Sequence, residues 1–359
     1  MNYRKKIKEE ALLISLLILL FILSLMSPYQ IKEYPYFVHW KTIAILAGLL
    51  LISTGLKESG LLHMFSEKIL SHMNTERKLA FFLILLTAFF SSFLTNDVAL
   101  FVVVPLTLGM QNLLNRDVSK LIIFEAISAN VGSSLTPIGN PQNIFIWQKW
   151  GISFLSFIIK LFPLTSILLL LLFMFTFISF KNKKLEKQRK QAHIEKFLAI
   201  SSFLFLITYL IFLQIDYIFY LLPIFFLFYL ILFPSVIKNT DWLLLFLFIL
   251  IFVDFQCVSN LWLIKQIMQK ISINHFLLSA FLSQFMSNVP ATIFISNFSN
   301  DWLKIAYGVN VGGNGFIFAS LANIIALRLS NKQIFIEFHK YSIPFFIISL
   351  SIVYLILIC

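Results

Sequence analysis

Two short polar phrases with the same pattern stand inside long apolar stretches of this chain. Residues 91–96 read Ser-Ser-Phe-Leu-Thr-Asn, and residues 283–288 read Ser-Gln-Phe-Met-Ser-Asn. Asparagine and hydroxyl side chains in apolar surroundings cost free energy unless they find hydrogen-bond partners. A polar turn that occurs twice in such surroundings is typical of the two halves of a membrane transporter that meet at one site.

Each phrase is followed by a second polar segment. Residues 130–143 hold two glycines, two prolines and three asparagines, a composition that a continuous apolar helix does not tolerate. We therefore expect an unwound segment, whose free carbonyls could coordinate a cation and whose following helix N-terminus could bind an anion. Residues 308–315 repeat the Asn-Val-Gly core, and we expect them to unwind as well. The alternative is a packing surface of the GxxxG type, made by Gly308 and Gly312.

Asp97 directly follows the asparagine of the first phrase. A carboxylate at membrane depth is a candidate proton carrier or cation ligand, and capping of the following helix is the structural alternative. Glu125 is expected nearer the cytoplasmic surface and Asp254 near the outer end of its span, so both are secondary candidates. No HExxH, Walker, GxSxG or cysteine-histidine pattern occurs. We therefore expect no enzyme and no cofactor, with H⁺ or Na⁺ as the coupling ion.

The composition indicates a polytopic membrane protein. The 359 residues are 59% hydrophobic and include 42 Phe, whereas only 12% are charged. No strand-like alternation recurs, so an all-α bundle is favoured over a β-barrel. The apolar runs that approach the length needed to span a bilayer are residues 11–26, 38–56, 152–180, 197–213, 217–233, 241–258 and 343–358.

The net charge of +12 is explained by basic residues that gather on one side of the membrane. With the N-terminus in the cytoplasm, 21 of the 28 Lys and Arg lie on the cytoplasmic side, as the positive-inside rule requires. Nucleic acid is therefore not an expected partner. We expect a multi-pass protein of the cytoplasmic membrane with a cytoplasmic N-terminus, in which the first apolar run is retained as a helix.

One basic, hydrophilic stretch, residues 181–196, separates two apolar halves. The first half, 1–180, has its core at 38–180, and the second, 197–359, at 240–359. The charge bias gives the halves opposite directions in the membrane, which predicts two inverted repeats. Each repeat should contain a re-entrant helical hairpin and a broken transmembrane helix. The arms of the first hairpin, 79–95 and 97–110, would be marginal for spanning alone, and an ordinary kinked helix is the alternative.

The polar segments resemble the ion-transporter superfamily. It includes arsenical pump membrane proteins (ArsB), citrate-transporter-like permeases, NhaD-type sodium/proton antiporters and sodium-coupled dicarboxylate symporters. The likeness lies in residues 93–106, 129–143, 287–294 and 308–328, and within the superfamily the chain looks most like YbiR-type anion permeases. It departs from the dicarboxylate branch at Val289, where that branch has Thr, and at 312–315, where that branch has Thr-Pro-Pro-Asn.

The resemblance implies a scaffold and a transport domain, with two hairpin tips and two broken helices around the ligand. By position it gives Thr95, Asn96, Ser287 and Asn288 as tip residues. By position it also gives Asn130, Gly132, Thr136, Pro137, Asn140, Asn310, Gly312 and Asn314 as residues of the unwound helices. Asp97 and Ser133, from the same segments, complete the candidate set, with Na⁺ at the tips as the candidate metal.

The function expected from these features is secondary active transport of a small anion or oxyanion by alternating access. Arsenite or antimonite and carboxylates are the substrate types in view. The alternatives are a Na⁺/H⁺ antiporter of the same fold and a channel subunit of an ATP-driven pump. The expected partners are a small inorganic or organic anion and membrane lipid, and a homodimer stays open.

Overall fold

The computed structural model describes residues 11–186, 194–214, 218–262, 266, 274–330 and 334–359. The N-terminal basic residues and residues 187–193 of the expected linker lie outside this described part. Within it the regular structure is helical, and an isolated antiparallel bridge joins Thr75 to Lys184. The expected all-α class is confirmed.

Four described helices are long and apolar enough to cross a membrane. They are α4 (Trp40–Glu58), α10 (Phe154–Ser179), α14 (Trp242–Asn260) and the run Phe335–Ile358, which joins α20 (Phe335–Val353) to the π-helical turn η3 (Tyr354–Ile358). A fifth arises if the bent pair near the N-terminus counts as one span. There α2 (Ala11–Met26) ends before Pro28, and the chain turns by 118° into η1 (Pro28–Glu33) and α3 (Tyr34–Phe37).

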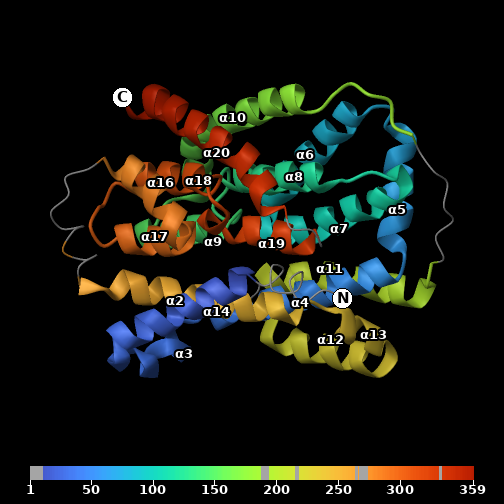
Figure 1. Cartoon of the computed structure of the whole chain (residues 1–359), viewed down its shortest axis with the longest axis horizontal. Helices are drawn as coiled ribbons and strands as arrows, with labels where there is room; N and C mark the ends of the chain where they lie inside the picture. The colour runs from blue at the N-terminus through green and yellow to red at the C-terminus, as the bar shows by residue number, and fades with distance from the viewer. Residues whose placement is uncertain (1–10, 187–193, 215–217, 263–265, 267–273, 331–333) are drawn as a thin grey trace. The chain divides into compact units, whose positions relative to one another are not determined.

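The chain divides into two compact units. The first consists of the described parts of residues 1–67 and 189–260. In it α4 packs against α11 (Lys196–Gln214), α12 (Ile218–Leu232), α13 (Pro234–Asn239) and α14, and α14 also packs against α2 (Figure 1). α5 (Leu61–His72) leads from this unit to the second.

Two glycines set the distance between α4 and its neighbours in the first unit. A Cβ on Gly48 would lie 2.3 Å from the ring of Tyr209, and one on Gly55 would lie 2.8 Å from the hydroxyl of Tyr229. Tyr209 is fully buried, and its hydroxyl donates to the Ala44 carbonyl at 2.9 Å. Because that hydrogen bond holds the ring in place, only a residue without a side chain fits opposite it.

The second unit consists of the described parts of residues 68–188 and 261–359, and it contains every candidate site residue. Its first half has a hairpin followed by a broken helix and a long helix: α6 (Glu76–Phe93), α7 (Asn96–Leu114), α8 (Ser119–Ser133), α9 (Pro141–Trp150) and α10. Its second half repeats that order: α16 (His275–Met286), α17 (Asn288–Ile295), α18 (Trp302–Gly312), the turn η2 (Ile317–Ala319), α19 (Leu321–Leu329) and α20.

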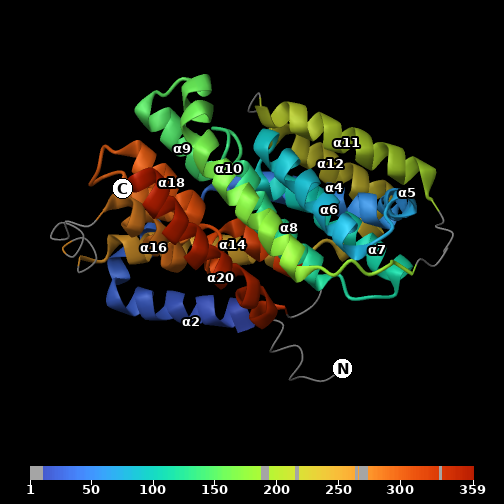
Figure 2. The ribbon, with the colours of Figure 1, turned by 90° about the horizontal axis from the view of Figure 1, so that it is seen from above.

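The two halves of the second unit are packed into each other. α6 packs on α8, and α16 packs on α18 in the same way. α19 lies against α7 and α8, and α17 lies against α9, so the helix that follows each break contacts helices of the other half. Figure 2 shows α10 running alongside α8 and α20.

The two hairpins differ in length. α16 and α17, with 12 and 8 residues, reach only about 18 and 12 Å, well short of the roughly 30 Å hydrocarbon core. α6 and α7 have 18 and 19 residues and reach about 27 and 28 Å. These arms are longer than the 17 and 14 residues expected, but neither is among the four described helices that are long and apolar enough to cross a membrane. The length argument for re-entry is therefore strongest for the second hairpin.

Replacing Gly48 with alanine should lower the thermal unfolding midpoint of the purified protein in detergent. The new Cβ collides with a buried, hydrogen-bonded ring, and overpacking of this kind costs about 1–3 kcal/mol. Lys57→Ala, at an exposed position in the last turn of the same helix, is the control and should change stability by less than about 0.5 kcal/mol. A Gly48→Ala protein as stable as the wild type would contradict the packing described above.

Candidate functional site

The tip of the first hairpin is capped by Thr95. Its side-chain hydroxyl accepts the Val98 N–H at 3.4 Å at the start of α7. The backbone N–H of Asn96 donates to the Gly139 carbonyl at 2.8 Å, which joins the tip to the break between α8 and α9. The Asn96 side chain is 2% exposed, and its Oδ1 accepts the Asp97 N–H at 3.0 Å.

Asn130, in the last turns of α8, joins the first hairpin to the second broken helix. Its Nδ2 donates to the Gly313 carbonyl at 3.0 Å and to Asn323 Oδ1 at 2.8 Å. Its Oδ1 accepts from Ser320 Oγ at 2.8 Å and from Asn96 Nδ2 at 3.4 Å. Both N–H groups and both lone pairs of this buried amide are therefore used.

Three further asparagines connect the first break to α18. Asn140 caps α9 by accepting the Asn143 N–H at 2.9 Å, and its Nδ2 donates to Asn310 Oδ1 at 3.0 Å. Asn310 Nδ2 in turn donates to Asn143 Oδ1 at 2.8 Å. Asn143 Nδ2 donates to the carbonyls of Ser133 and Thr136 at 3.2 and 3.1 Å. Side-chain amides thus satisfy carbonyls that the end of α8 leaves free.

The tip of the second hairpin has a strained backbone. Ser287, between α16 and α17, has φ 66° and ψ 153°, a conformation found almost exclusively in glycine. Asn288 follows it, is 2% exposed and has its amide beside Gly313, where an added Cβ would lie 3.0 Å from Nδ2. The second tip therefore lies beside Gly313, whose carbonyl also accepts a hydrogen bond from Asn130.

Gln284, one turn before this tip, holds the second break. Its Nε2 donates to the Gly312 carbonyl at 2.8 Å, and its Oε1 accepts the Phe316 N–H at 2.8 Å. In the first hairpin, Ser92 has the corresponding place in the repeated phrase. Its hydroxyl donates to the Gly132 carbonyl at 2.8 Å, and Thr136 Oγ1 donates to the Ser92 carbonyl at 2.6 Å.

The breaks are shorter than the sequence suggested. α8 continues through Ser133 and α18 through Gly312, so the unwound parts begin only at residues 134 and 313. Five residues expected in unwound segments are therefore helical, namely Asn130, Gly132, Ser133, Asn310 and Gly312. Thr136, Pro137, Asn140 and Asn314 do lie in the breaks.

Helix packing explains the glycines. A Cβ on Gly132 would lie 2.2 Å from the Ala88 carbonyl oxygen, and one on Gly312 would lie 2.8 Å from the Cβ of Ser283. Gly308 meets the Phe276 carbonyl in the same way at 2.4 Å. The packing alternative for Gly308 and Gly312 is thus the one observed, and it brings α8 against α6 and α18 against α16.

Some buried oxygens around the tips and breaks lack a hydrogen-bond partner within the described residues. They include Asp97 Oδ1, Asn314 Oδ1 and Gln142 Oε1. Thr95 is the N-cap of α7. The Asp97 carboxylate therefore does not have the capping role that was its structural alternative. An unpaired buried carboxylate or amide oxygen can take a proton or a hard cation such as Na⁺. Among the described residues no three His, Cys, Asp or Glu side chains gather as a metal site.

Two further acidic residues are fully buried. Glu125 is 0% exposed and accepts the Thr107 hydroxyl at 2.5 Å. Asp254, in α14 of the first unit, is also 0% exposed, and neither of its oxygens has a partner within the described residues.

The structure adds four residues to the candidate set: Asn143, Gln284, Ser320 and Asn323. Gln284 stands in the second polar phrase and Asn143 in the polar segment 130–143, so their amides could have been singled out there. Ser320 and Asn323 are polar residues in an apolar stretch, but their partner, Asn130, is far away in the sequence.

Comparison with known proteins places the chain among membrane transporters. Residues 8–299 match the model of the family described as citrate transporter (CitMHS). The chain is 38% identical to the inner membrane protein YbiR of Escherichia coli K12 over 345 residues, which is 94% of this chain and 92% of that protein. It is also 38% identical to the uncharacterized transporter MJ0456 of Methanocaldococcus jannaschii, over 89% of both chains. A transporter named arsB from Dictyostelium discoideum is 29% identical over 128 residues, or 36% of this chain and 23% of that protein.

Replacing Ser287 with glycine should stabilise the protein. Glycine adopts the observed backbone angles freely, so the change should raise the free energy of unfolding by about 1 kcal/mol. Ser287→Ala is the matched control, because it removes the same hydroxyl and keeps the strain. The measurement is the thermal unfolding midpoint of the three proteins in one detergent. Equal midpoints for the glycine and alanine variants would refute the strain.

Proposed function

We propose that this protein, which belongs to the citrate transporter family, is a secondary active transporter that moves a small anion by alternating access. Membership of that family makes it a membrane transporter and not an enzyme. The transported anion, its coupling and the mechanism are our inference. The observation that carries it is the convergence of helix N-termini on the asparagine network of the second unit.

Four helices of the second unit begin at this network. They are α7 after Thr95, α9 after Asn140, α17 after Ser287 and α19 after Ser320. Helix N-termini carry a partial positive charge and free N–H groups, which makes them anion-binding elements without any Arg or Lys. A broken helix that presents its N-terminus at membrane depth is the arrangement that transporters use for anionic substrates.

A coupling cation is supported by the unpaired oxygens. Asp97 Oδ1 and Asn314 Oδ1 lie in the segments that form the network and have no hydrogen-bond partner within the described residues. A carboxylate buried without a partner is costly, so protonation or binding of Na⁺ would stabilise it. We propose H⁺ or Na⁺ as the coupling ion and Asp97 as the group that responds to it. Na⁺/H⁺ exchange without an anion is the competing function.

We further propose that residues 38–180 and 240–359 are inverted repeats whose hairpins open to opposite sides of the membrane. The common order of elements in the two halves of the second unit supports this, as does the charge bias of the sequence. The same bias supports a cytoplasmic N-terminus. The name of the relative YbiR supports a place in the inner, cytoplasmic membrane.

Transport by the purified protein in proteoliposomes tests the proposal. Citrate, succinate and arsenite are offered in turn under an imposed pH gradient, Na⁺ gradient or membrane potential. The proposal requires saturable flux of at least one anion that depends on one of these gradients. Flux without saturation or gradient dependence would indicate a channel, and cation exchange with no anion flux would indicate the antiporter.

Asn96→Ala and Asn288→Ala should each abolish most of the transport while leaving the amount of protein in the membrane unchanged. Each removes a buried amide at a hairpin tip, and an effect of about 1–3 kcal/mol corresponds to roughly 5- to 150-fold. Initial rates of flux, normalised to protein amount, are the measurement. Asn239→Ala, at an exposed position in the first unit, is the control and should transport normally. Normal flux in Asn96→Ala would remove the first tip from the binding site.

Asp97→Asn tests the coupling role separately. The amide keeps the size of the side chain but can neither take up a proton nor balance the charge of Na⁺. We expect anion exchange to continue while the driving effect of the coupling gradient falls about tenfold or more, as a loss of ~1.4 kcal/mol of coupling would give. The ratio of flux with and without the gradient is measured for both proteins. An unchanged ratio would leave Asp97 without a coupling role.

A further inference from the structure

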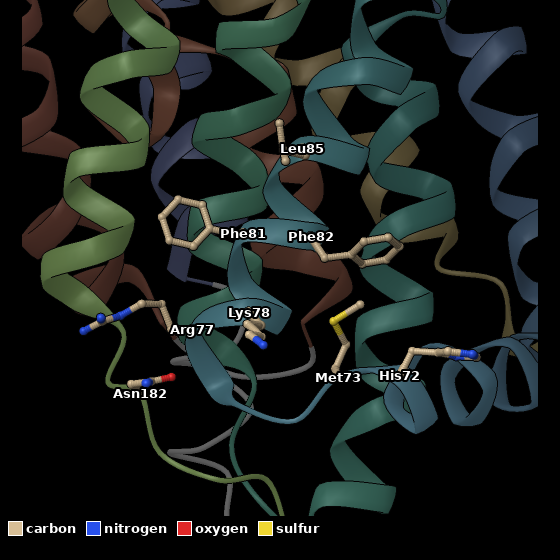
Figure 3. Close-up of a pocket in the computed structure, with 8 residues that line it drawn as sticks. All are labelled: His72, Met73, Arg77, Lys78, Phe81, Phe82, Leu85 and Asn182. Carbon is tan, nitrogen blue, oxygen red and sulfur yellow. The ribbon is translucent and has the colours of Figure 1, made fainter.

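A groove at the beginning of α6 combines basic and apolar side chains. It has a volume of about 530 Å³ and lies entirely within the second unit. Figure 3 shows Arg77, Lys78 and His72 around the first turn of α6 and the preceding segment. Phe81, Phe82 and Leu85 line the groove farther along the helix.

The basic end of the groove gains further positive charge from the segment after α10. The Glu76 N–H donates to the Lys183 carbonyl at 3.0 Å, and the Leu185 N–H donates to the Asn74 carbonyl at 3.1 Å. These backbone hydrogen bonds hold a lysine-rich segment, Lys181, Lys183 and Lys184, beside the start of α6. Glu76 is the acidic residue in the first turn of α6, so the positive charges outnumber it. The N-terminus of α6 adds its own partial positive charge.

Arg77 is held in place at this end. Its Nε donates to the Phe180 carbonyl at 2.8 Å, and its guanidinium lies 4.1 Å from the ring centre of Phe177. An arginine has further N–H donors on its two Nη atoms, and these suit the oxygens of a phosphate. Lys78 is exposed, so its ammonium is accessible to a ligand in the groove.

An apolar stripe continues from the groove along α6. Five residues at intervals of four share one face of the helix: Arg77, Phe81, Leu85, Phe89 and Phe93. Leu85, Phe89 and Phe93 are 51%, 60% and 56% exposed. From Arg77 to Phe89 the helix rises about 18 Å, slightly more than half of the roughly 30 Å hydrocarbon core. The part of the stripe up to Phe89 is thus comparable in length to one lipid leaflet.

We propose that this groove and stripe bind one anionic phospholipid, with its phosphate at Arg77 and Lys78 and an acyl chain along Phe81, Leu85 and Phe89. The charge of the groove selects an anionic headgroup over a zwitterionic one, because basic clusters at the end of a membrane helix attract anionic lipids. The aromatic and aliphatic wall provides apolar contact that a free phosphate ion does not use. The ligand is therefore the whole lipid.

Lipid binding to the full-length, delipidated protein in detergent tests this inference. Phosphatidylglycerol and phosphatidylcholine with identical acyl chains are titrated separately, and bound lipid is counted by native mass spectrometry. Wild-type protein should bind phosphatidylglycerol at least fivefold more tightly. Lys78→Gln should weaken that binding about fivefold, the change that corresponds to one basic residue near a lipid headgroup. Leu85→Ser, at an exposed position, should weaken the binding of both lipids.

Lys238→Gln is the matched control, since Lys238 is a lysine of α13 in the first unit and lies outside the groove. Equal affinity of the wild type for the two lipids would overturn the proposal, and so would an equal loss in Lys238→Gln and Lys78→Gln. Inorganic phosphate is then added at millimolar concentration to the lipid-bound protein. Complete displacement of phosphatidylglycerol, together with normal lipid binding by Leu85→Ser, would assign the groove to free phosphate and overturn the lipid assignment.

Discussion

The second unit depends on the hydrogen bonds of a single buried amide, that of Asn130. Polar groups at membrane depth have no water to bind, so each must find its partner within the protein. Asn130 provides such partners for Asn96 at the first tip and for Gly313, Ser320 and Asn323 at the second break. Without it, several buried groups would lose a partner, at about 1–3 kcal/mol each. Non-helical backbone persists in this unit because side-chain amides replace the hydrogen bonds that helices would have made.

The polar side chains at the hairpin tips reach the breaks because glycines let the helices approach closely. Gly132 brings α8 onto α6, and Gly312 brings α18 onto α16, each at a distance that excludes a Cβ. With α8 against α6, the Ser92 hydroxyl reaches the Gly132 carbonyl. With α18 against α16, Gln284 reaches the Gly312 carbonyl. Close helix packing and hydrogen bonding of the breaks therefore depend on each other, because each glycine contact also places a donor beside one of the last carbonyls of a broken helix.

The sequence was sufficient for the features that depend on local chemistry. Composition predicted the all-α class. The extent of unwinding was mispredicted, because glycine and asparagine weaken a helix only until tertiary contacts compensate, and Asn130 and Gly132 have such contacts. Asn323 was missed for a related reason: its partner, Asn130, lies 193 residues away, and nothing local marks the pair. Likewise, the burial of Glu125 follows from packing that periodicity does not reveal.

The distribution of satisfied and unsatisfied atoms bears on how such a network could serve transport. A network amide exchanges one partner for another at little net cost, since a buried hydrogen bond contributes only about 0.5–1.5 kcal/mol beyond its competitor. A bound anion or cation could thus replace protein–protein hydrogen bonds between the tips and breaks at a small net change in free energy. Most amides of the network have partners for both their oxygen and their nitrogen, whereas the carboxylate oxygen Asp97 Oδ1 and the amide oxygen Asn314 Oδ1 have none within the part of the chain that the structure describes. Unpaired oxygens are the positions at which an ion adds bonds without breaking any, so they favour ion binding first and rearrangement of the amides second. In the proposed transport cycle, that order would couple the ion to the movement of the anion.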